Sequence, residues 1–96
     1  MSVILQSELV NFIAQHERYM RGIHGGRRLD LSLQTGHELD FLKKSLPAAE
    51  FVGAFLNRSN FSRCQLQQTN FFGATLNNSS FVEADLSQAD MRGAID

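Results

Sequence analysis

Large apolar residues recur at every fifth position in the second half of the chain. Nine consecutive five-residue units run without an insertion from Ala49 to Gly93. The third residue of each unit is large and apolar, and the first is small. The large positions hold Phe51, Leu56, Phe61, Leu66, Phe71, Leu76, Phe81, Leu86 and Met91, and the small ones hold Ala49, Ala54, Ser59, Cys64, Thr69, Ala74, Ser79, Ala84 and Ala89. A fixed period of this kind predicts a repeat architecture.

A period of five fits neither the 3.6-residue helix nor an unbroken strand. It does fit a short extended piece followed by a turn, because alternate residues of an extended chain point the same way. We therefore predict that the first and third residues of each unit face inward. The other three residues face water or form the turn, and a chain that bends at every unit coils on itself.

The number of units in one coil follows from two further patterns. Phe and Leu alternate at the large position, so two or four units per coil would stack like on like, whereas three would mix them. Glycine occupies the fifth position only at Gly53, Gly73 and Gly93, which are twenty residues apart. One coil is therefore predicted to hold four units, about 4.8 Å from the next coil. The predicted stacks are Phe41, Phe61 and Phe81 on one side, and Leu46, Leu66 and Leu86 on another.

These units resemble the repeats of the pentapeptide-repeat family. The motif of that family is a small residue, then often Asp or Asn, then Leu or Phe, then two polar residues. The units ADLSQ and ADMRG match it closely, and SNFSR, TNFFG and ATLNN match it well. The resemblance covers Leu29 to Asp96. It implies a right-handed quadrilateral parallel β-helix, here of about three and a half coils.

The first part of the chain carries the period of a helix instead. Between Ser2 and about Arg21, apolar residues fall three or four apart on one broad face. That face holds Leu5, Leu9, Phe12, Ile13, His16, Tyr19 and Met20. Ser2 or Ser7 could cap the start of this helix, and Gly22, Gly25 and Gly26 end it. We read residues 1–28 as an amphipathic helix followed by a basic, Gly-rich linker.

An amphipathic helix has to bury its apolar face on something. Because solenoids need covered ends, we predict that it lies as a lid over the first coil. A helix on a membrane surface is disfavoured, since Glu8 and Glu17 offset Arg18 and Arg21.

The five-residue register extends backwards from Ala49 in a degenerate form. Residues 29–48 keep the frame, but their small positions hold residues that are too big or too polar for a tight interior. The large positions are Leu31, Gly36, Phe41 and Leu46, and the small positions are Leu29, Gln34, Leu39 and Lys44. We predict a widened first coil within a β-helix of residues 29–96. Leu29 and Leu39 would contact the helix, and Lys44 would reach solvent or a carboxylate.

The last coil is unfinished in this sequence. After Gly93 it holds only Ala94, Ile95 and Asp96. The open end would show Phe81, Leu86, Met91 and unpaired backbone groups, which invite pairing. We therefore expect an end-to-end homodimer, as symmetric dimers are the commonest oligomers, or a partner docked there. The alternative is that the sequence is an excerpt of a longer chain.

Apolar residues also gather at outward positions beside the glycines. Stacked coils would join Val52, Phe55, Phe72 and Ile95 into one strip, with Arg92 next to it. Exposed apolar patches often mark interfaces, and aromatic residues and Arg are enriched in hot spots. The alternatives are cover by the protein's own helix and scattered surface hydrophobes.

The acidic residues suggest a second kind of surface. Family members that protect DNA gyrase are thought to imitate duplex DNA with a negative rod, so the resemblance makes the carboxylates candidates for such mimicry. They are Asp30, Glu50, Glu83, Asp85, Asp90 and Asp96. Because Arg58 and Arg63 interrupt these faces, an ordinary solvated surface is favoured. Asn57 with Asn77, and Gln68 with Gln88, are predicted to form side-chain amide ladders.

Composition excludes several classes of function. The formal net charge is −1, so no overall bias demands nucleic acid, and the basic linker with Arg27 and Arg28 is read as a solvated loop. Cys64 is the single cysteine, which rules out an internal disulfide and suits a reducing compartment, and it is expected to be a buried packing thiol. We see no signal peptide, no membrane-spanning stretch, and no metal-ligand or catalytic spacing. We expect a cytoplasmic protein without a cofactor.

The expected function is therefore a non-enzymatic protein-interaction module with a rigid β-helix surface. The narrowest hypothesis is an inhibitor or protector acting on a DNA-processing machine, either a gyrase-type DNA mimic or a phage anti-defence or anti-CRISPR inhibitor. One alternative is a structural or targeting module of a secreted bacterial effector. A second is nucleic-acid binding through the basic linker.

Overall fold

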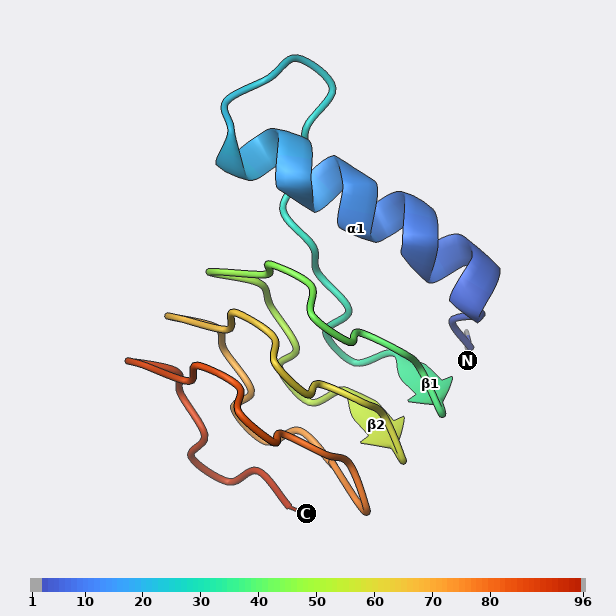
Figure 1. The fold of residues 1–96 in the computed structure, drawn as a ribbon. Coiled ribbons are helices and arrows are strands. Elements are labelled where there is room, and N and C mark those ends of the chain that lie inside the picture. The colour runs from blue at the N-terminus through green and yellow to red at the C-terminus, as the bar shows by residue number, and fades with distance from the viewer. Residues whose placement is uncertain (1–2, 96) are drawn as a thin grey trace.

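The structure, a computed structural model, describes residues 3–95 as one helix lying across one end of a stack of coils (Figure 1). Helix α1 spans Gln6–Met20, and two short strands follow, β1 at Thr35–His37 and β2 at Phe55–Asn57. The strands pair in parallel with residues twenty apart in register, such as Gly36 with Leu56. Single bridges continue the same twenty-residue spacing from Asp30–Glu50 to Thr75–Ile95. The predicted β-helix with four units per coil is confirmed.

Each five-residue unit ends in a β-turn whose fifth residue has a positive φ. In one such turn the Ala54 N–H donates to the Phe51 carbonyl at 3.1 Å, and Gly53 has a φ of 64°. Type II turns need this left-handed conformation at their third residue. The same conformation occurs at Leu33, Glu38, Lys43, Ala48, Arg58, Arg63, Gln68, Asn78, Glu83 and Gln88. Glycine therefore marks three of the turns, although every turn has the geometry that suits it.

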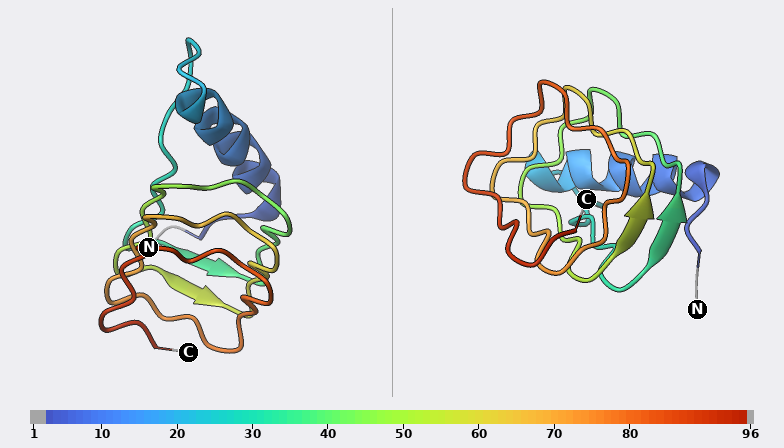
Figure 2. Two further views of the ribbon diagram at one scale, coloured as in Figure 1. Left: turned by 60° about the vertical axis from the view of Figure 1, so that its left-hand side comes forward. Right: turned by 90° about the horizontal axis from the view of Figure 1, so that it is seen from below.

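The interior is filled by the first and third residues of the units, as predicted. Phe41 and Phe61 stack with ring centroids 4.3 Å apart, and Phe51 and Phe71 stack at 4.8 Å. The two stacks come from opposite sides of the coil and meet edge to face, with Phe51 and Phe61 at an interplanar angle of 88°. The view along the stack shows the coils enclosing this interior (Figure 2, right). Such aromatic packing adds to the burial of apolar area.

The degenerate first coil closes by exchanging a large and a small position. Gly36 leaves its large position empty, and the side chain of Leu39, from the next small position, fills that space. A Cβ atom at Gly36 would collide with the Leu39 side chain and would lie 3.5 Å from Leu56. Leu29 and Leu39 are both buried, as expected, and Lys44 is exposed.

Helix α1 lies as a lid over this first coil, and its buried side chains are Leu9, Ile13 and His16. The predicted helical face was too broad. Leu5 precedes the helix, and Tyr19 and Met20 are exposed near its end. These residues share the helical period, but they extend beyond the area that the coil can cover.

The helix begins later than predicted and ends as predicted. The Leu5 N–H donates to Glu8 Oε1 at 2.9 Å, while Ser7 lies inside the helix and so does not cap it. The other proposed cap, Ser2, lies outside the described residues. At the other end, Gly22 has a φ of 68°, and the Ile23 N–H donates to the Arg18 carbonyl at 2.9 Å. This pattern is a Schellman motif, in which glycine is favoured.

The residues just before the helix form an extended segment that the sequence did not reveal. Val3 makes a parallel bridge with Thr35, and the Ile4 N–H donates to the Thr35 carbonyl at 2.7 Å. The chain thus adds a strand of its own to one side of the first coil before the helix crosses it.

Candidate interaction surfaces

The apolar residues predicted to form a strip stand on two adjacent columns of the β-helix. Phe55, Thr75 and Ile95 are joined by parallel bridges. On the neighbouring column, the Gly53 N–H donates to the Phe72 carbonyl at 2.9 Å, which sets Phe72 next to Val52. Phe55 is 49% exposed, Phe72 43% and Ile95 59%. We call Val52, Phe55, Phe72 and Ile95 the corner strip.

The corner strip extends further than the sequence suggested. Leu33 is 76% exposed, and its N–H donates to the Val52 carbonyl at 2.9 Å. Its side chain would lie 2.9 Å from a Cβ atom at Gly53. Sequence reasoning passed over Leu33 because it belongs to the degenerate coil, although it is in frame with the glycines. Val3, paired with Thr35, continues the other column towards the helix.

Arg92 lies at the edge of the corner strip and contacts both Asp90 and Phe72. Its Nη2 lies 2.8 Å from Asp90 Oδ2, and its guanidinium lies over the Phe72 ring, 5.6 Å from the centroid. The side-chain hydrogen bond with Arg92 lowers the pKa of the Asp90 carboxyl, and the same bond raises the pKa of Arg92. The strip therefore has a planar cationic group stacked on one of its two aromatic rings.

The last coil shows part of its interior. Phe81 and Leu86 are half-buried and Met91 is 36% exposed, whereas Phe61 and Leu66 one coil earlier are fully buried. The Phe61 N–H donates to the Ser80 carbonyl at 2.7 Å. Within residues 3–95, the equivalent N–H of Phe81 has no acceptor on a following coil.

Three of the six acidic candidates form ion pairs. Asp30, Glu50 and Asp90 share one column, interrupted by Asn70. Glu50 lies 3.2 Å from Arg28 and Glu83 lies 3.1 Å from Arg63, while Asp90 binds Arg92. Such pairs cancel much of the negative potential that a DNA mimic would need.

Asp30 and Asp85 form no ion pair in the described part of the chain. Asp85 accepts hydrogen bonds from Ser87 and Gln67, and the Ser87 bonds lower the pKa of its carboxyl. Asp96 lies outside the described residues.

The predicted amide ladders formed at one of the two places. Gln68 Nε2 donates to Gln88 Oε1 at 3.1 Å. For Asn57 the prediction is wrong, because its buried Oδ1 has no hydrogen-bond partner among the described residues. The Asn57 column lies at a polar hollow that also includes His37 and Arg58.

The remaining candidate groups are the single cysteine and the possible metal ligands. Cys64 is buried, its thiol bonds to the Phe41 carbonyl, and burial raises its pKa. Residues 3–95 hold no group of three His, Cys, Asp or Glu side chains that could bind a metal ion. Helix α1 falls short of the length and apolarity that a membrane span requires.

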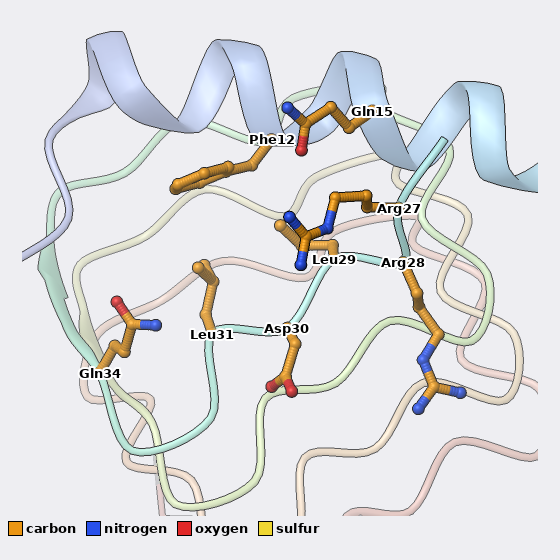
Figure 3. Close-up of a pocket in the computed structure, with 8 residues that line it drawn as sticks. All are labelled: Phe12, Gln15, Arg27, Arg28, Leu29, Asp30, Leu31 and Gln34. Atoms are coloured by element: carbon orange, nitrogen blue, oxygen red, sulfur yellow. The ribbon is translucent and has the colours of Figure 1, made fainter. Parts of the chain in front are cut away.

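A cavity of about 230 Å³ lies between helix α1 and the first coil. Phe12, Leu29 and Leu31 form its apolar part, and Figure 3 shows Arg27 extending beneath Gln15 towards its centre. Sequence reasoning assigned Arg27 to a solvated loop and did not anticipate this cavity, because its walls come from segments distant in sequence.

Comparison with known proteins gives one family match. A family model described as Pentapeptide repeats matches in eight copies, over residues 46–78 and 59–95. Among solved structures, the chain is similar to a pentapeptide repeat protein, Rfr23, from the cyanobacterium Cyanothece 51142. The two share 18% identity with a TM-score of 0.37, over 69% of this chain and 55% of that one. The chain thus spans about half the length of that protein. No curated protein sequence matches.

Proposed function

Because the chain belongs to the pentapeptide-repeat family, we propose that it is a non-enzymatic interaction module that binds a partner protein through the corner strip. The observation that carries this proposal is the alignment of Phe55, Phe72 and Ile95, all exposed, on neighbouring columns of stacked coils. Clustered exposed apolar groups of this kind are typical of protein interfaces.

The β-helix would support such binding by holding the strip rigid. Phe72 belongs to a coil that is hydrogen-bonded on both sides: its carbonyl accepts from Gly53 at 2.9 Å, and Gly73 donates to Arg92 at 3.0 Å. A surface that is already ordered loses little conformational entropy on binding. The Arg92 guanidinium stacked on Phe72 adds a group that is enriched in interface hot spots.

We also propose that the protein has no catalytic role. The interior is filled by phenylalanine and leucine stacks, so the coils enclose no room for a substrate. The hollows lie on the outside of the coils or beneath the helix.

We propose that a second copy of the chain packs against the exposed end of the last coil. Phe81, Leu86 and Met91 offer an apolar surface there, and a two-fold axis would place it against itself. Such a dimer would double the length of the rod, which we take to be right-handed and to have about three and a half coils per protomer.

A DNA-mimicking inhibitor of a DNA-processing machine is a narrower form of this proposal. It has less support, because Arg28, Arg63 and Arg92 pair with three of the carboxylates it would use. If the chain were instead a targeting module of a secreted effector, it could bind through the same corner strip and would not need a negatively charged surface. Nucleic-acid binding through the basic N-terminal residues would depend on Arg18, Arg21 and Arg27, since Arg28 pairs with Glu50.

Affinity capture with matched variants tests the corner strip. We expect a specific partner from the source organism to be retained by the wild type and lost with Phe72→Asp. Val82→Asp is the control, because Val82 is an exposed apolar residue outside the strip. The proposal is wrong if the wild type and both variants retain the same proteins.

Light scattering tests the proposed dimer separately. We expect a dimeric mass for the wild type and a monomeric mass for Met91→Asp, with Phe72→Asp remaining dimeric. A wild-type monomer at all concentrations would refute the dimer and leave the corner strip untouched.

A further inference from the structure

Each side of a coil presents three backbone groups to the coil before it. On the side that contains Asn70, the Asn70 N–H donates to the Ala49 carbonyl at 3.0 Å. The Asn70 carbonyl accepts from the Phe51 N–H at 2.7 Å. The third group is the Phe72 carbonyl, which accepts from Gly53 at 2.9 Å. The first coil has no earlier coil, so its four sides need other partners for these groups.

The N-terminal segment supplies partners on three of the four sides. Thr35 accepts from the Ile4 N–H at 2.7 Å. On the next side, the side-chain amide of Gln6 takes the place of a strand: it accepts from the Asp40 N–H at 2.8 Å and donates to the Asp40 carbonyl at 3.1 Å. On the last side, His16 Nε2 lies 2.8 Å from the Pro47 carbonyl.

The side that contains Asp30 is left open. In the described part of the chain, neither the N–H nor the carbonyl of Asp30 has a hydrogen-bond partner, and the Ser32 carbonyl has none. The complete set of three groups is therefore free on this side. A free set of this kind is a template for adding a strand.

The open edge borders the cavity of about 230 Å³ beneath helix α1. In a parallel strand added here, inward-facing side chains would meet Phe12 and Leu31, which line the cavity. The Asp30 carboxylate would not obstruct the strand, because it accepts from the Ser32 N–H at 3.0 Å and points away from the helix (Figure 3).

Of the charged residues that line this cavity, Arg27 offers a binding point for an acidic side chain, while the Asp30 carboxylate points away from the helix. Arg28 points away from the cavity and pairs with Glu50 at 3.2 Å. Arg27 points into it and has no ion pair within residues 3–95. The backbone of Arg27 is anchored, because its N–H donates to the Gln15 carbonyl at 3.0 Å. From this anchored backbone the guanidinium extends to the neighbourhood of Leu29, near the start of the open edge, where it can bind a carboxylate.

We propose that this edge and cavity bind an extended peptide of a partner protein, which adds as a parallel strand and places an acidic side chain on Arg27. The peptide would imitate a repeat of the chain. Its backbone would accept from the Asp30 N–H and donate to the Asp30 and Ser32 carbonyls, and one apolar side chain would pack on Phe12 and Leu31. The site begins beside the corner strip, since the Val52 N–H donates to Ser32 Oγ at 3.2 Å, but it uses different groups.

The test uses the full chain and a capped hexapeptide, Glu-Ala-Thr-Val-Thr-Thr, titrated to about 2 mM. In ¹H–¹⁵N NMR spectra we expect the largest shifts at the Asp30 and Ser32 amides. The same peptide with an N-methyl group on its valine lacks the N–H that donates to Asp30. We expect it to bind at least about tenfold more weakly.

Matched variants test the role of the charge. Arg27→Ala should weaken binding of the glutamate peptide about tenfold and leave binding of a glutamine analogue unchanged. Arg21→Ala is the control, because Arg21 lies outside the cavity, and it should bind as the wild type does. Equal binding of the N-methylated peptide, an absence of shifts at Asp30, or equal shifts with acetate alone would each overturn the proposal.

Discussion

His16 Nε2 lies 2.8 Å from the carbonyl oxygen of Pro47. The other ring nitrogen, Nδ1, accepts from the Leu29 N–H at 2.8 Å. Because a backbone N–H can only donate, Nδ1 must carry no proton, and Nε2–H must donate to Pro47. The imidazole is fully buried and neutral, and it joins helix α1 to both ends of the first coil.

This arrangement predicts a loss of stability in mild acid. Burial, more than any other effect, lowers the pKa of His16 from its ordinary value of 6.5, and Arg28 lowers it further; the Pro47 bond and Glu17 oppose this. As pH falls below about 6.5, the unfolded chain takes up a proton that the folded chain does not bind. The free energy of unfolding therefore falls until the folded-state pKa is reached, by about 1.4 kcal/mol for each unit of lowering.

Urea unfolding between about pH 7.5 and pH 5 checks this prediction. His16→Gln, which cannot titrate, should lose less stability over the same range than the wild type. Equal pH dependence in the two proteins would show that His16 is not the group responsible.

Gly36 and Leu39 should be energetically coupled. Leu39→Ala should cost about 2–5 kcal/mol, because it empties a buried space. Gly36→Ala alone should also destabilise, because its Cβ would collide with the Leu39 side chain. In the double variant that collision is absent, so the combined loss should be at least about 1 kcal/mol smaller than the sum. Chemical denaturation of all four proteins measures this difference, and additive losses would contradict the coupling.

Two serines at equivalent inward positions should respond differently to alanine. Ser79 Oγ donates to the Leu56 carbonyl at 2.7 Å and accepts from the Ser59 N–H at 3.0 Å. The buried Ser59 Oγ has no partner among the described residues. We therefore expect Ser79→Ala to cost about 1–3 kcal/mol and Ser59→Ala to be neutral or slightly stabilising. Thermal unfolding of the two variants measures both losses, and a larger loss of stability for Ser59→Ala than for Ser79→Ala would contradict the prediction.

Substitutions at Gly73 measure how much the positive φ of the turn costs in stability when the residue carries a side chain. The φ of Gly73 is 67°, and a Cβ atom there would meet nothing within 4 Å. Gly73→Ala should therefore cost about 1 kcal/mol through the backbone alone. Gly73→Asn should cost less, because asparagine tolerates the left-handed region. A melting temperature that alanine leaves unchanged would mean that the turn relaxes without strain.

The repeating part of the fold could be predicted because its interior is chemically periodic. Large apolar residues such as Phe51 and small residues such as Ala54 recur at fixed spacing. The burial of these side chains and the twenty-residue register of the coils therefore follow from the pattern. The corner strip followed from the same frame. Leu33 was missed because its own unit has a degenerate interior, even though its turn position is regular.

The contacts of the lid could not be predicted in the same way. Gln6 meets Asp40 across 34 residues of sequence, and His16 meets Pro47 across 31. These pairs depend on where the helix crosses the coil, and no periodic signal encodes that. The exchange between Gly36 and Leu39 was hidden for a related reason, because each residue looks like a defect until the other is seen beside it.

The alternation of phenylalanine and leucine limits how such a chain can change length. An insertion of one unit before Phe61 would set Phe61 above a leucine column, and the rings after the insertion would no longer stack on the rings before it. An insertion of two units would keep rings above rings but would move Gly73 and Phe72 to the opposite corner. Only whole coils of twenty residues preserve both the interior and the surface. Gene duplication should therefore lengthen proteins of this design in twenty-residue steps, and shorter insertions should be confined to the lid.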